Sequence, residues 1–422
     1  MKNLSERDKK HLWHPLTQHR LHPDMLPIVK AKGALMFDDD GNSYIDGIAS
    51  WYTAMYGHGH PDIVRAMTEQ MQTLDFVMFS GFTHPPAIEL SERLMAILPD
   101  NQKKIFFNDN GSTAIEAAIK MALQYYHNKG DKRDTLIAFE NGFHGDTFGA
   151  MSASGLSSYN GPFEDFLLKV VRIPVPQENT MDSVLERLET ILENNACAAF
   201  VFEPLVQGAA GMKFHSAKGL DKLIAKCRTA GVLTVADEIM TGFGKTGPNF
   251  AVNFLEQRPD IICLSKALTA GMFPLSITSC SMAVYEAFLS DEVAKGFFHA
   301  HTFSAHPIGC AAALAGLRLL NSDAIVVRRT AIEKAHKAFA TEIRTHEKIS
   351  EVRTLGVILA IDLKEKTGRY GTLRDRLYRF FMENGVNLRP LGNTIYTLPP
   401  YVITDSELQH IYDTIKKALE IV

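Results

Sequence analysis

The chain has 422 residues, of which 46% are hydrophobic and 22% are charged, and its formal net charge is −4. This length allows a large buried core and two domains, while the nearly balanced charge gives no indication of nucleic acid or an anionic membrane as a partner. The start is polar, no apolar run is long enough to span a bilayer, and the five scattered cysteines resemble reduced core residues, so we expect a cytoplasmic protein.

The N-terminal segment, residues 1–60, is predicted to contain short strands and to pack with the C-terminal part of the chain. Within it, the stretch GALMFDDDGNSYIDG has apolar residues on both sides of Asp40 and Gly41. An Asp-Gly pair between two such runs is typical of the tight turn of a β-hairpin. We therefore expect a hairpin here.

Residues 61–310 are predicted to form a large α/β domain. From about residue 103, short apolar runs typical of buried strands alternate with longer amphipathic stretches typical of helices. Such alternation predicts a mostly parallel sheet covered by helices. The expected strands lie at residues 103–109, 134–142, 197–205, 232–239, 260–265 and 276–282.

After Pro307 the pattern changes, and residues 311–422 are predicted to form a smaller α+β domain. Strand-like segments are mixed there with long helical stretches. The helices are expected at about 307–321, 324–346, 373–384 and from about 405.

A single lysine at the end of a predicted buried strand is the first candidate for catalysis. Lys266 follows the apolar run of residues 261–264. A lone lysine in this position is most simply the exposed end of the strand. Alternatively, it is kept partly desolvated, so that its amine can lose a proton and attack a carbonyl.

Three further patterns decide between these interpretations only when they are combined. Gly111 and Ser112 begin a helix, where backbone N–H groups and the helix dipole suit a phosphate. Asp237 ends a buried strand and needs a cationic partner, such as a protonated pyridine nitrogen. Phe143 follows a strand among glycines, where an aromatic face suits a flat ring. Each has an ordinary structural explanation, but with Lys266 they describe a covalently held pyridoxal phosphate and a lysine that moves a proton.

Two competing patterns are weaker. The sequence GFGKTG at 242–247 has the glycine spacing of a dinucleotide-binding turn, but Pro248 and Asn249 follow where a long helix should begin. Two His-x-His pairs, at 58–60 and 299–301, lack a carboxylate-histidine set with metal-ligand spacing.

Four stretches of the chain, VFEPLVQGAAGM, ADEIMTGFGKTG, CLSKALTAG and HTFSAHPIGCAAALA, resemble in order and spacing the class III pyridoxal-phosphate aminotransferases of fold type I. The resemblance covers nearly the whole chain. It implies a homodimer with shared active sites, in which Lys266 binds the cofactor covalently. The implied cofactor-binding residues are Gly111, Ser112, Phe143, Asp237, Lys266, His301 and, from the neighbouring subunit, Thr302. The implied substrate-binding residues are Trp51, Phe143, Ala300 and Arg389, with Arg389 on a substrate carboxylate.

Within this class, the stretches LWHPLTQ, GIASWYTAMYGHGHP, MFSGFTHPPAIEL and LRPLGNTIYTLPPYVI resemble members that convert 8-amino-7-oxononanoate to 7,8-diaminononanoate in biotin biosynthesis. S-adenosylmethionine is the amino donor that this resemblance implies. The chain departs from those members at Leu16 and Phe143, where tyrosine is usual, and at Lys245, where arginine is usual. Another class III ω-aminotransferase, acting on diamines, lysine or ω-amino acids, is the alternative. A non-catalytic or nucleotide-binding α/β protein is a more distant one.

Overall fold

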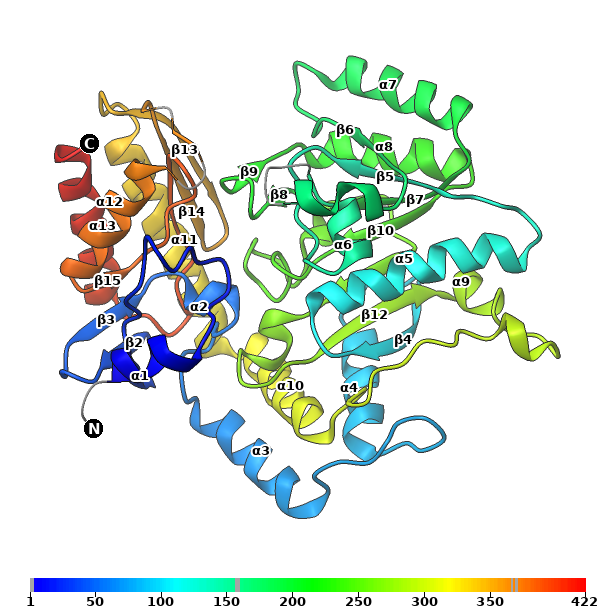
Figure 1. Ribbon diagram of the computed structural model, residues 1–422, viewed down its shortest axis with the longest axis horizontal. Helices are drawn as coiled ribbons and strands as arrows, with labels where there is room; N and C mark the ends of the chain where they lie inside the picture. The colour runs from blue at the N-terminus through cyan, green and yellow to red at the C-terminus, as the bar shows by residue number, and fades with distance from the viewer. Residues whose placement is uncertain (1–3, 156–159, 366, 369–370) are drawn as a thin grey trace.

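The computed structural model describes residues 4–155, 160–365, 367–368 and 371–422, and a seven-stranded sheet dominates the larger of its two lobes (Figure 1). The strand order is β4-β12-β11-β10-β7-β5-β6. Only β12 runs antiparallel to its neighbours, which confirms the predicted mostly parallel sheet. The strands are β4 (Gln102–Asn108), β5 (Thr135–Phe139), β6 (Val170–Ile173), β7 (Cys197–Phe202), β10 (Leu233–Asp237), β11 (Ile261–Leu264) and β12 (Ser276–Ser281).

Helices cover both faces of this sheet because its central strands are apolar on both sides. Successive residues of β7, such as Val201 and Phe202, point to opposite faces of the sheet and belong to separate core clusters, as expected from the two-residue period of a strand. The cluster of Val201 includes α5, and that of Phe202 includes α7 and α8. The helices of this lobe are α3 (Pro61–Thr73), α4 (Pro85–Met95), α5 (Gly111–Asn128), α6 (Phe148–Ala153), α7 (Met181–Asn194), α8 (Ala217–Thr229) and α9 (Met282–Glu286). Shorter elements are β8 (Val206–Gln207), β9 (Lys213–Phe214) and the 3-10 helices η1 (Gly161–Phe166), η2 (Ala251–Phe254), η3 (Lys266–Thr269) and η4 (Val293–Lys295).

The N-terminal strands form a second sheet together with a strand from near the C-terminus. The expected hairpin is confirmed: β2 (Leu35–Asp38) and β3 (Ser43–Asp46) are antiparallel, and Gly41 in their turn has φ +88°. The strand β1 (Ile28–Lys32) pairs with β2, and β15 (Val386–Asn387) pairs in parallel with β3. The sheet therefore joins distant parts of the chain: Asp46 and Asn387, which are hydrogen-bonded across it, are 341 positions apart in the sequence.

The smaller lobe is built on a three-stranded antiparallel sheet of β13 (Ile349–Leu355), β14 (Ile358–Leu363) and β16 (Thr394–Thr397). The four helices predicted for this part of the chain are confirmed to within a few residues. They are α10 (Pro307–Leu320), α11 (Asp323–Ile343), α12 (Thr372–Glu383) and α13 (Asp405–Glu420). Among the described residues, no single helix is long and apolar enough to cross a membrane; only α10 and α11, bent by 68°, pass that test as a pair.

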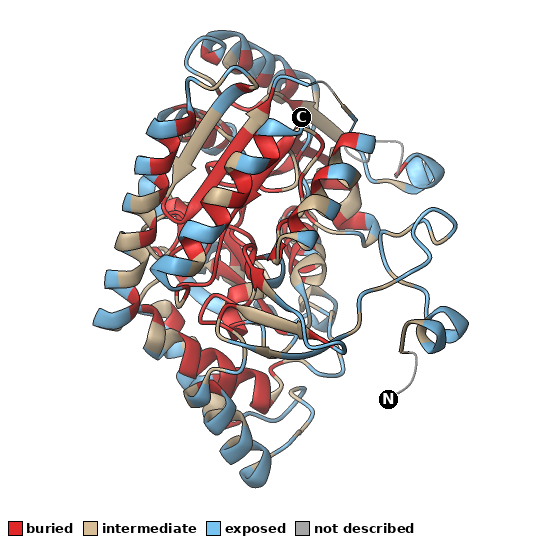
Figure 2. Cartoon of the chain, turned by 90° about the vertical axis from the view of Figure 1, so that its left-hand side faces the viewer, coloured by how far each residue is buried: buried red, intermediate tan, exposed pale blue. Residues whose placement is uncertain are grey.

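The chain before β1 contrasts with the rest in burial. From Leu4 to Pro27, which includes α1 (Leu4–His11), no residue is buried, and Trp13 is 90% exposed. Figure 2 shows this segment standing apart from the buried core. All five cysteines, by contrast, are buried free thiols.

Candidate active site

Asp237 and Lys266 lie on neighbouring parallel strands, at the same edge of the large sheet. Asp237 is the last residue of β10 and is in register with Cys263 of β11; Lys266 begins the 3-10 turn η3 just beyond β11. Lys266 has φ +50°, an uncommon conformation for a residue with a side chain. The carboxyl edge of a parallel sheet is where α/β proteins commonly bind ligands. The structure thus brings together two of the residues singled out from the sequence.

Asp237 is buried and held at both carboxylate oxygens. Oδ1 accepts a hydrogen bond from the Ile239 N–H at 3.0 Å, and Oδ2 lies 2.7 Å from His144 Nδ1. Burial alone would lower the pKa of His144, but the hydrogen bond and the charge of Asp237 raise it above its ordinary value. His144 and Asp237 therefore form a buried pair in which the carboxylate favours the protonated imidazole. His144 Nε2 is also buried, and it has no hydrogen-bond partner among the described residues.

Glu203 is a site residue that the sequence analysis missed. It follows β7 and is buried; its carboxylate accepts hydrogen bonds from the Phe143 N–H at 3.0 Å and the Gly208 N–H at 2.8 Å. Burial raises the pKa of Glu203 to about 7. Because its carboxylate accepts these two backbone N–H groups, Glu203 fixes the backbone that carries Phe143. A carboxylate directly after an apolar strand, the signal that identified Asp237, could have identified Glu203 too.

Lys266 has the electrostatic surroundings of a reactive amine. Burial lowers its pKa, and the negative charges of Asp237 and Glu203 oppose only part of this effect. Its Nζ lies 5.1 Å from the ring centroid of Tyr52, within the range of a cation–π contact. The Tyr52 hydroxyl in turn donates to the Tyr396 hydroxyl at 2.9 Å. The sequence analysis assigned no role to either tyrosine.

The start of α5 forms a close-packed cradle beside these residues. Ser112 Oγ lies 2.7 Å from Thr147 Oγ1 and accepts the Thr147 N–H at 3.0 Å. Gly145 has φ +134°, and a Cβ there would lie 2.2 Å from Ser112 Oγ. A Cβ on Gly111 would lie 3.0 Å from Ile239, the residue that bonds Asp237. Glycine at these two positions lets the helix N-terminus approach the Asp237 edge, where its N–H groups suit an anion.

A second group of residues surrounds Arg389, which lies two residues beyond β15. Its guanidinium carbon is 5.3 Å from the ring centroid of Trp51 and 5.6 Å from that of Tyr378 on α12. Arg389 makes no ion pair with any described residue. A guanidinium flanked by aromatic rings and lacking a carboxylate partner suits a carboxylate ligand.

Trp51 and Tyr52 reach these two groups from one unusual turn. In α2 (Ala49–Tyr52), four consecutive residues have positive φ, at +46°, +46°, +66° and +69°. This is a single left-handed turn with no glycine in it, and left-handed geometry costs roughly 1–2 kcal/mol per residue. Because the adjacent side chains of Trp51 and Tyr52 contact Arg389 and Lys266, respectively, the turn connects the two ends of the site.

Three further predicted site residues, Ala300, His301 and Thr302, lie together in the segment before α10. Ala300 and Thr302 are exposed. His301 is half-buried, with Nδ1 3.8 Å from Asp109 and Nε2 3.2 Å from His299. Their roles remain predictions.

The competing motif at 242–247 forms a junction between the lobes. Lys245 is fully buried and donates to the Gly242 carbonyl, while its own carbonyl accepts the Val357 N–H from the smaller lobe. The Tyr401 hydroxyl donates to the Phe243 carbonyl. A dinucleotide fold would require a long helix directly after the motif, and none follows it in the described residues.

The described residues also contain no group of three or more ligands able to hold a metal.

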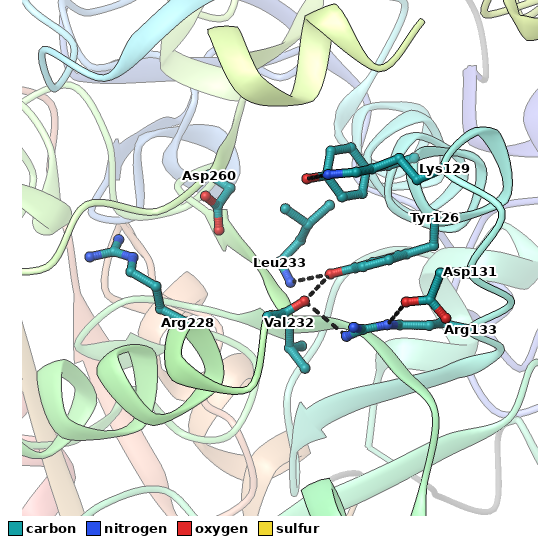
Figure 3. A pocket seen from close by; sticks show the side chains of 10 residues that line it. Tyr126, Lys129, Asp131, Arg133, Arg228, Val232, Leu233 and Asp260 are labelled. Carbon is teal, nitrogen blue, oxygen red and sulfur yellow. Dashed lines mark hydrogen bonds and ion pairs between the residues drawn. The ribbon is translucent and has the colours of Figure 1, made fainter.

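A surface hollow elsewhere on the sheet is separate from this site. Figure 3 shows it lined by residues that include Tyr126, Arg133 and Leu233, the first residue of β10. It therefore lies at the opposite end of that strand from Asp237. Its Arg133 is already bound to Asp131 at 2.8 Å and to the Gly231 carbonyl at 2.8 Å.

The Asp237 end of the site has the groups that pyridoxal phosphate requires. It offers a buried carboxylate for the ring nitrogen, a helix N-terminus for the phosphate and a desolvated lysine for the carbonyl. Gly111 and Gly145 allow the close packing of this helix start, because a Cβ on either residue would crowd Ile239 or Ser112.

Comparison with known proteins identifies the family. The family model for class-III aminotransferases matches residues 17–419. The chain belongs to the class-III aminotransferases. This aminotransferase is 43% identical over 97% of its length to the adenosylmethionine-8-amino-7-oxononanoate aminotransferase of Synechococcus elongatus, of which 98% is covered. It is 33% identical over 99% of its length to the enzyme of that name from Staphylococcus aureus, of which 97% is covered.

Solved structures of transaminases share its fold over nearly the whole chain. The adenosylmethionine-8-amino-7-oxononanoate aminotransferase of Methanocaldococcus jannaschii has a TM-score of 0.93 at 31% identity, covering 99% of both chains. An omega transaminase from Pseudomonas jessenii, solved in complex with PMP, has a TM-score of 0.91 at 27% identity, covering 99% of this chain and 98% of that one.

Proposed function

We propose that this aminotransferase binds pyridoxal phosphate and converts 8-amino-7-oxononanoate to 7,8-diaminononanoate, with S-adenosylmethionine as amino donor. The observation that supports the proposal most is that one site combines a cofactor end, with Lys266 and Asp237, and a substrate end, with Arg389. Lys266 and Asp237 suit the cofactor, and Arg389, which has no ion-pair partner among the described residues, suits the carboxylate of a keto acid. The names and the identities of the relatives support the same substrate.

The residues at the Asp237 edge would hold the cofactor. When bound, pyridoxal phosphate supplies a carbonyl that binds amines and a ring that withdraws electrons from them. Asp237 would accept a hydrogen bond from the protonated ring nitrogen and keep it charged, while the His144 ion pair holds the carboxylate in place. Gly111 and Ser112 would bind the phosphate, and Phe143 would cover the ring.

Lys266 would both bind the cofactor and move the proton. Its lowered pKa increases the fraction of neutral amine, which is the form that attacks a carbonyl and accepts a proton. The Tyr52 ring beneath its Nζ would favour the protonated form that follows. Burial and the Tyr52 ring thus act in opposite directions on the protonation of Lys266, which suits a group that takes up and returns one proton.

Arg389 would select substrates with a distant carboxylate. A guanidinium binds a carboxylate through two parallel hydrogen bonds, and Trp51 and Tyr378 restrict its motion beforehand. A diamine lacks the carboxylate and would gain nothing from this group. This favours the keto acid over the diamines that an alternative ω-aminotransferase would use.

We further propose that the enzyme is a cytoplasmic homodimer. The segment before β1 buries none of its described residues although it carries Trp13 and Leu21, and Phe82, Phe298 and Phe303 are also exposed. Exposed apolar surface of this kind is typical of an interface. Ala300, His301 and Thr302 would then complete the site of the neighbouring subunit. Five buried free thiols suit a reducing compartment.

Complementation of a biotin auxotroph tests the substrate assignment. We expect the wild-type gene to restore growth without biotin, and Lys266→Ala to fail. A visible absorption band of the purified protein tests cofactor binding separately. Growth that is not restored, combined with turnover of diamines by the purified protein, would replace this proposal with the ω-aminotransferase alternative.

A further inference from the structure

Asp46 is a buried carboxylate that lies outside both ends of the site. It is the last residue of β3 and is fully buried. Its Oδ2 accepts a hydrogen bond from Ser50 Oγ at 2.8 Å and lies 2.9 Å from His58 Nε2, while Oδ1 accepts one from Asn387 Nδ2 at 3.2 Å. Burial alone would raise the pKa of Asp46, but the bonds from His58 and Ser50 hold it below its usual value. Asp46 is therefore a charged acceptor with three side-chain partners.

One partner belongs to the left-handed turn. Ser50 has φ +46° and directly precedes Trp51, whose ring faces Arg389. Backbone bonds from Tyr52 to Ile48 and from Thr53 to Ala49 close the turn, but such bonds do not offset the steric penalty of the left-handed form. The hydrogen bond from Ser50 to the buried carboxylate of Asp46 adds a side-chain restraint to the turn.

Another partner belongs to the strand that leads to Arg389. Asn387 is paired with Asp46 in the parallel ladder of β15 and β3, and it lies two residues before Arg389. The two segments also pack closely, because a Cβ on Gly47 would lie 2.6 Å from Leu388 Cδ2. A shift of β15 relative to β3 would thus move Arg389 away from the turn that carries Trp51.

We propose that Asp46 is a positioning residue for the substrate carboxylate, because one buried side chain binds both the turn that presents Trp51 and the strand that presents Arg389. This inference rests on the proposed function of Arg389. Asp46 itself makes no described contact with Lys266 or Asp237, so its main effect is expected at the carboxylate end. Its loss loosens the geometry of Arg389, whereas Tyr52, the residue of the turn that reaches Lys266, is also held by its own hydrogen bond to Tyr396.

The test compares 8-amino-7-oxononanoate with its methyl ester, which has the same chain but no charge on the terminal group. In Asp46→Asn, which keeps the shape and removes the charge, we expect KM for the acid to rise by about fivefold or more, as for a lost charged hydrogen bond. KM for the ester, kcat for both and the visible absorption maximum of the holoenzyme should change by less than about twofold. Ser50→Ala and Asn387→Ala remove one bond each, and both should raise KM for the acid in the same direction.

Two controls separate positioning from a general structural role. Asp38→Asn alters another buried carboxylate of the same hairpin, bound by Asn42 and Tyr44, and should leave both KM values unchanged. In an Arg389→Ala background, Asp46→Asn should have no further effect on KM for the acid, because the two changes act on one interaction.

Equal rises in KM for acid and ester, or additive effects with Arg389→Ala, would overturn the proposal. If Asp46→Asn does not fold, unchanged acid kinetics in Ser50→Ala and Asn387→Ala would overturn it too. Failure of the wild type to turn over the acid would instead reject the proposed function.

Discussion

The two ends of the site are built in different ways. Asp237, Glu203 and Lys266 follow the ends of buried parallel strands, whose positions are set by the core on both sides. Arg389 and Trp51 come from a two-residue strand and a strained turn, and Trp51 is 43% exposed. The cofactor end is therefore held by the packed core on both faces of the sheet, and the substrate end by a small number of individual side-chain contacts. We expect substitutions at the first end to affect chemistry and stability, and those at the second to affect selectivity.

The largest effect is expected at Lys266. In the proposed function, Lys266→Ala would remove both the covalent anchor and the group that moves the proton, so turnover should fall by at least about 10²–10⁴-fold. Thermal unfolding should change little, because the methylene chain is the only packed part that is lost. Borohydride reduction followed by peptide mass spectrometry should label Lys266 in the wild type. The matched control is Lys222→Ala, which removes an exposed lysine and should leave both the label and the turnover unchanged. A label on another lysine, such as the buried Lys245, would remove Lys266 from this role.

The cofactor end should also show a pH-dependent stability that a single substitution removes. The pKa of Glu203 is raised to about 7 from 4.5, so between these values the folded protein binds a proton that the unfolded chain does not. Its stabilising contribution is complete below about pH 4.5 and is lost as the pH rises through 7. Glu203→Gln mimics the protonated form, so its free energy of unfolding relative to wild type should increase by roughly 2–3 kcal/mol over this range.

Urea unfolding at several pH values measures this difference, and Glu186→Gln on the exposed face of α7 is the matched control. A difference between Glu203→Gln and wild type that stays constant with pH would mean that the pKa of Glu203 is the same in the folded and unfolded states. Such a result would mean that water or the bound cofactor offsets the burial of this carboxylate.

At the substrate end, Arg389→Ala should raise KM for the oxononanoate by at least about tenfold, because a carboxylate bound by charged hydrogen bonds loses its partner. The methyl ester should be affected much less. Arg379→Ala, which removes an exposed guanidinium from the same helix as Tyr378, serves as the control. Unchanged kinetics with the acid would exclude Arg389 from the site and would also remove the contrast between the two ends.

The strands that carry Asp237 and Lys266 could be predicted from the sequence, and the turn that carries Trp51 could not. A buried strand is indicated by a short apolar run, and a charged residue at the end of such a run is easy to detect. Asp237 and Lys266 could therefore be identified from residues 232–239 and 260–266. The left-handed turn has no such signature, since Ala49–Tyr52 contains no glycine to announce positive φ. Ser50 of this turn is bound to Asp46, whose other partner Asn387 lies 341 positions away, beyond the reach of any local pattern.

Leu16 gives the smallest expected effect, and it tests whether the substrate end also selects the amino donor. Leu16 is 62% exposed in the segment that buries none of its described residues, so its side chain is free to contact substrate or a second subunit. The keto acid is largely methylene and should tolerate an apolar wall, whereas S-adenosylmethionine loses a hydrogen bond where the resembled enzymes have tyrosine, worth roughly 0.5–1.5 kcal/mol. Leu16→Tyr should therefore strengthen the apparent affinity for S-adenosylmethionine by about two- to tenfold and leave that for lysine as donor unchanged. Single-turnover loss of the cofactor absorbance with each donor measures this. If the tyrosine variant gains nothing with S-adenosylmethionine, position 16 does not set donor affinity, and selectivity at this end resides in the groups around Arg389 alone.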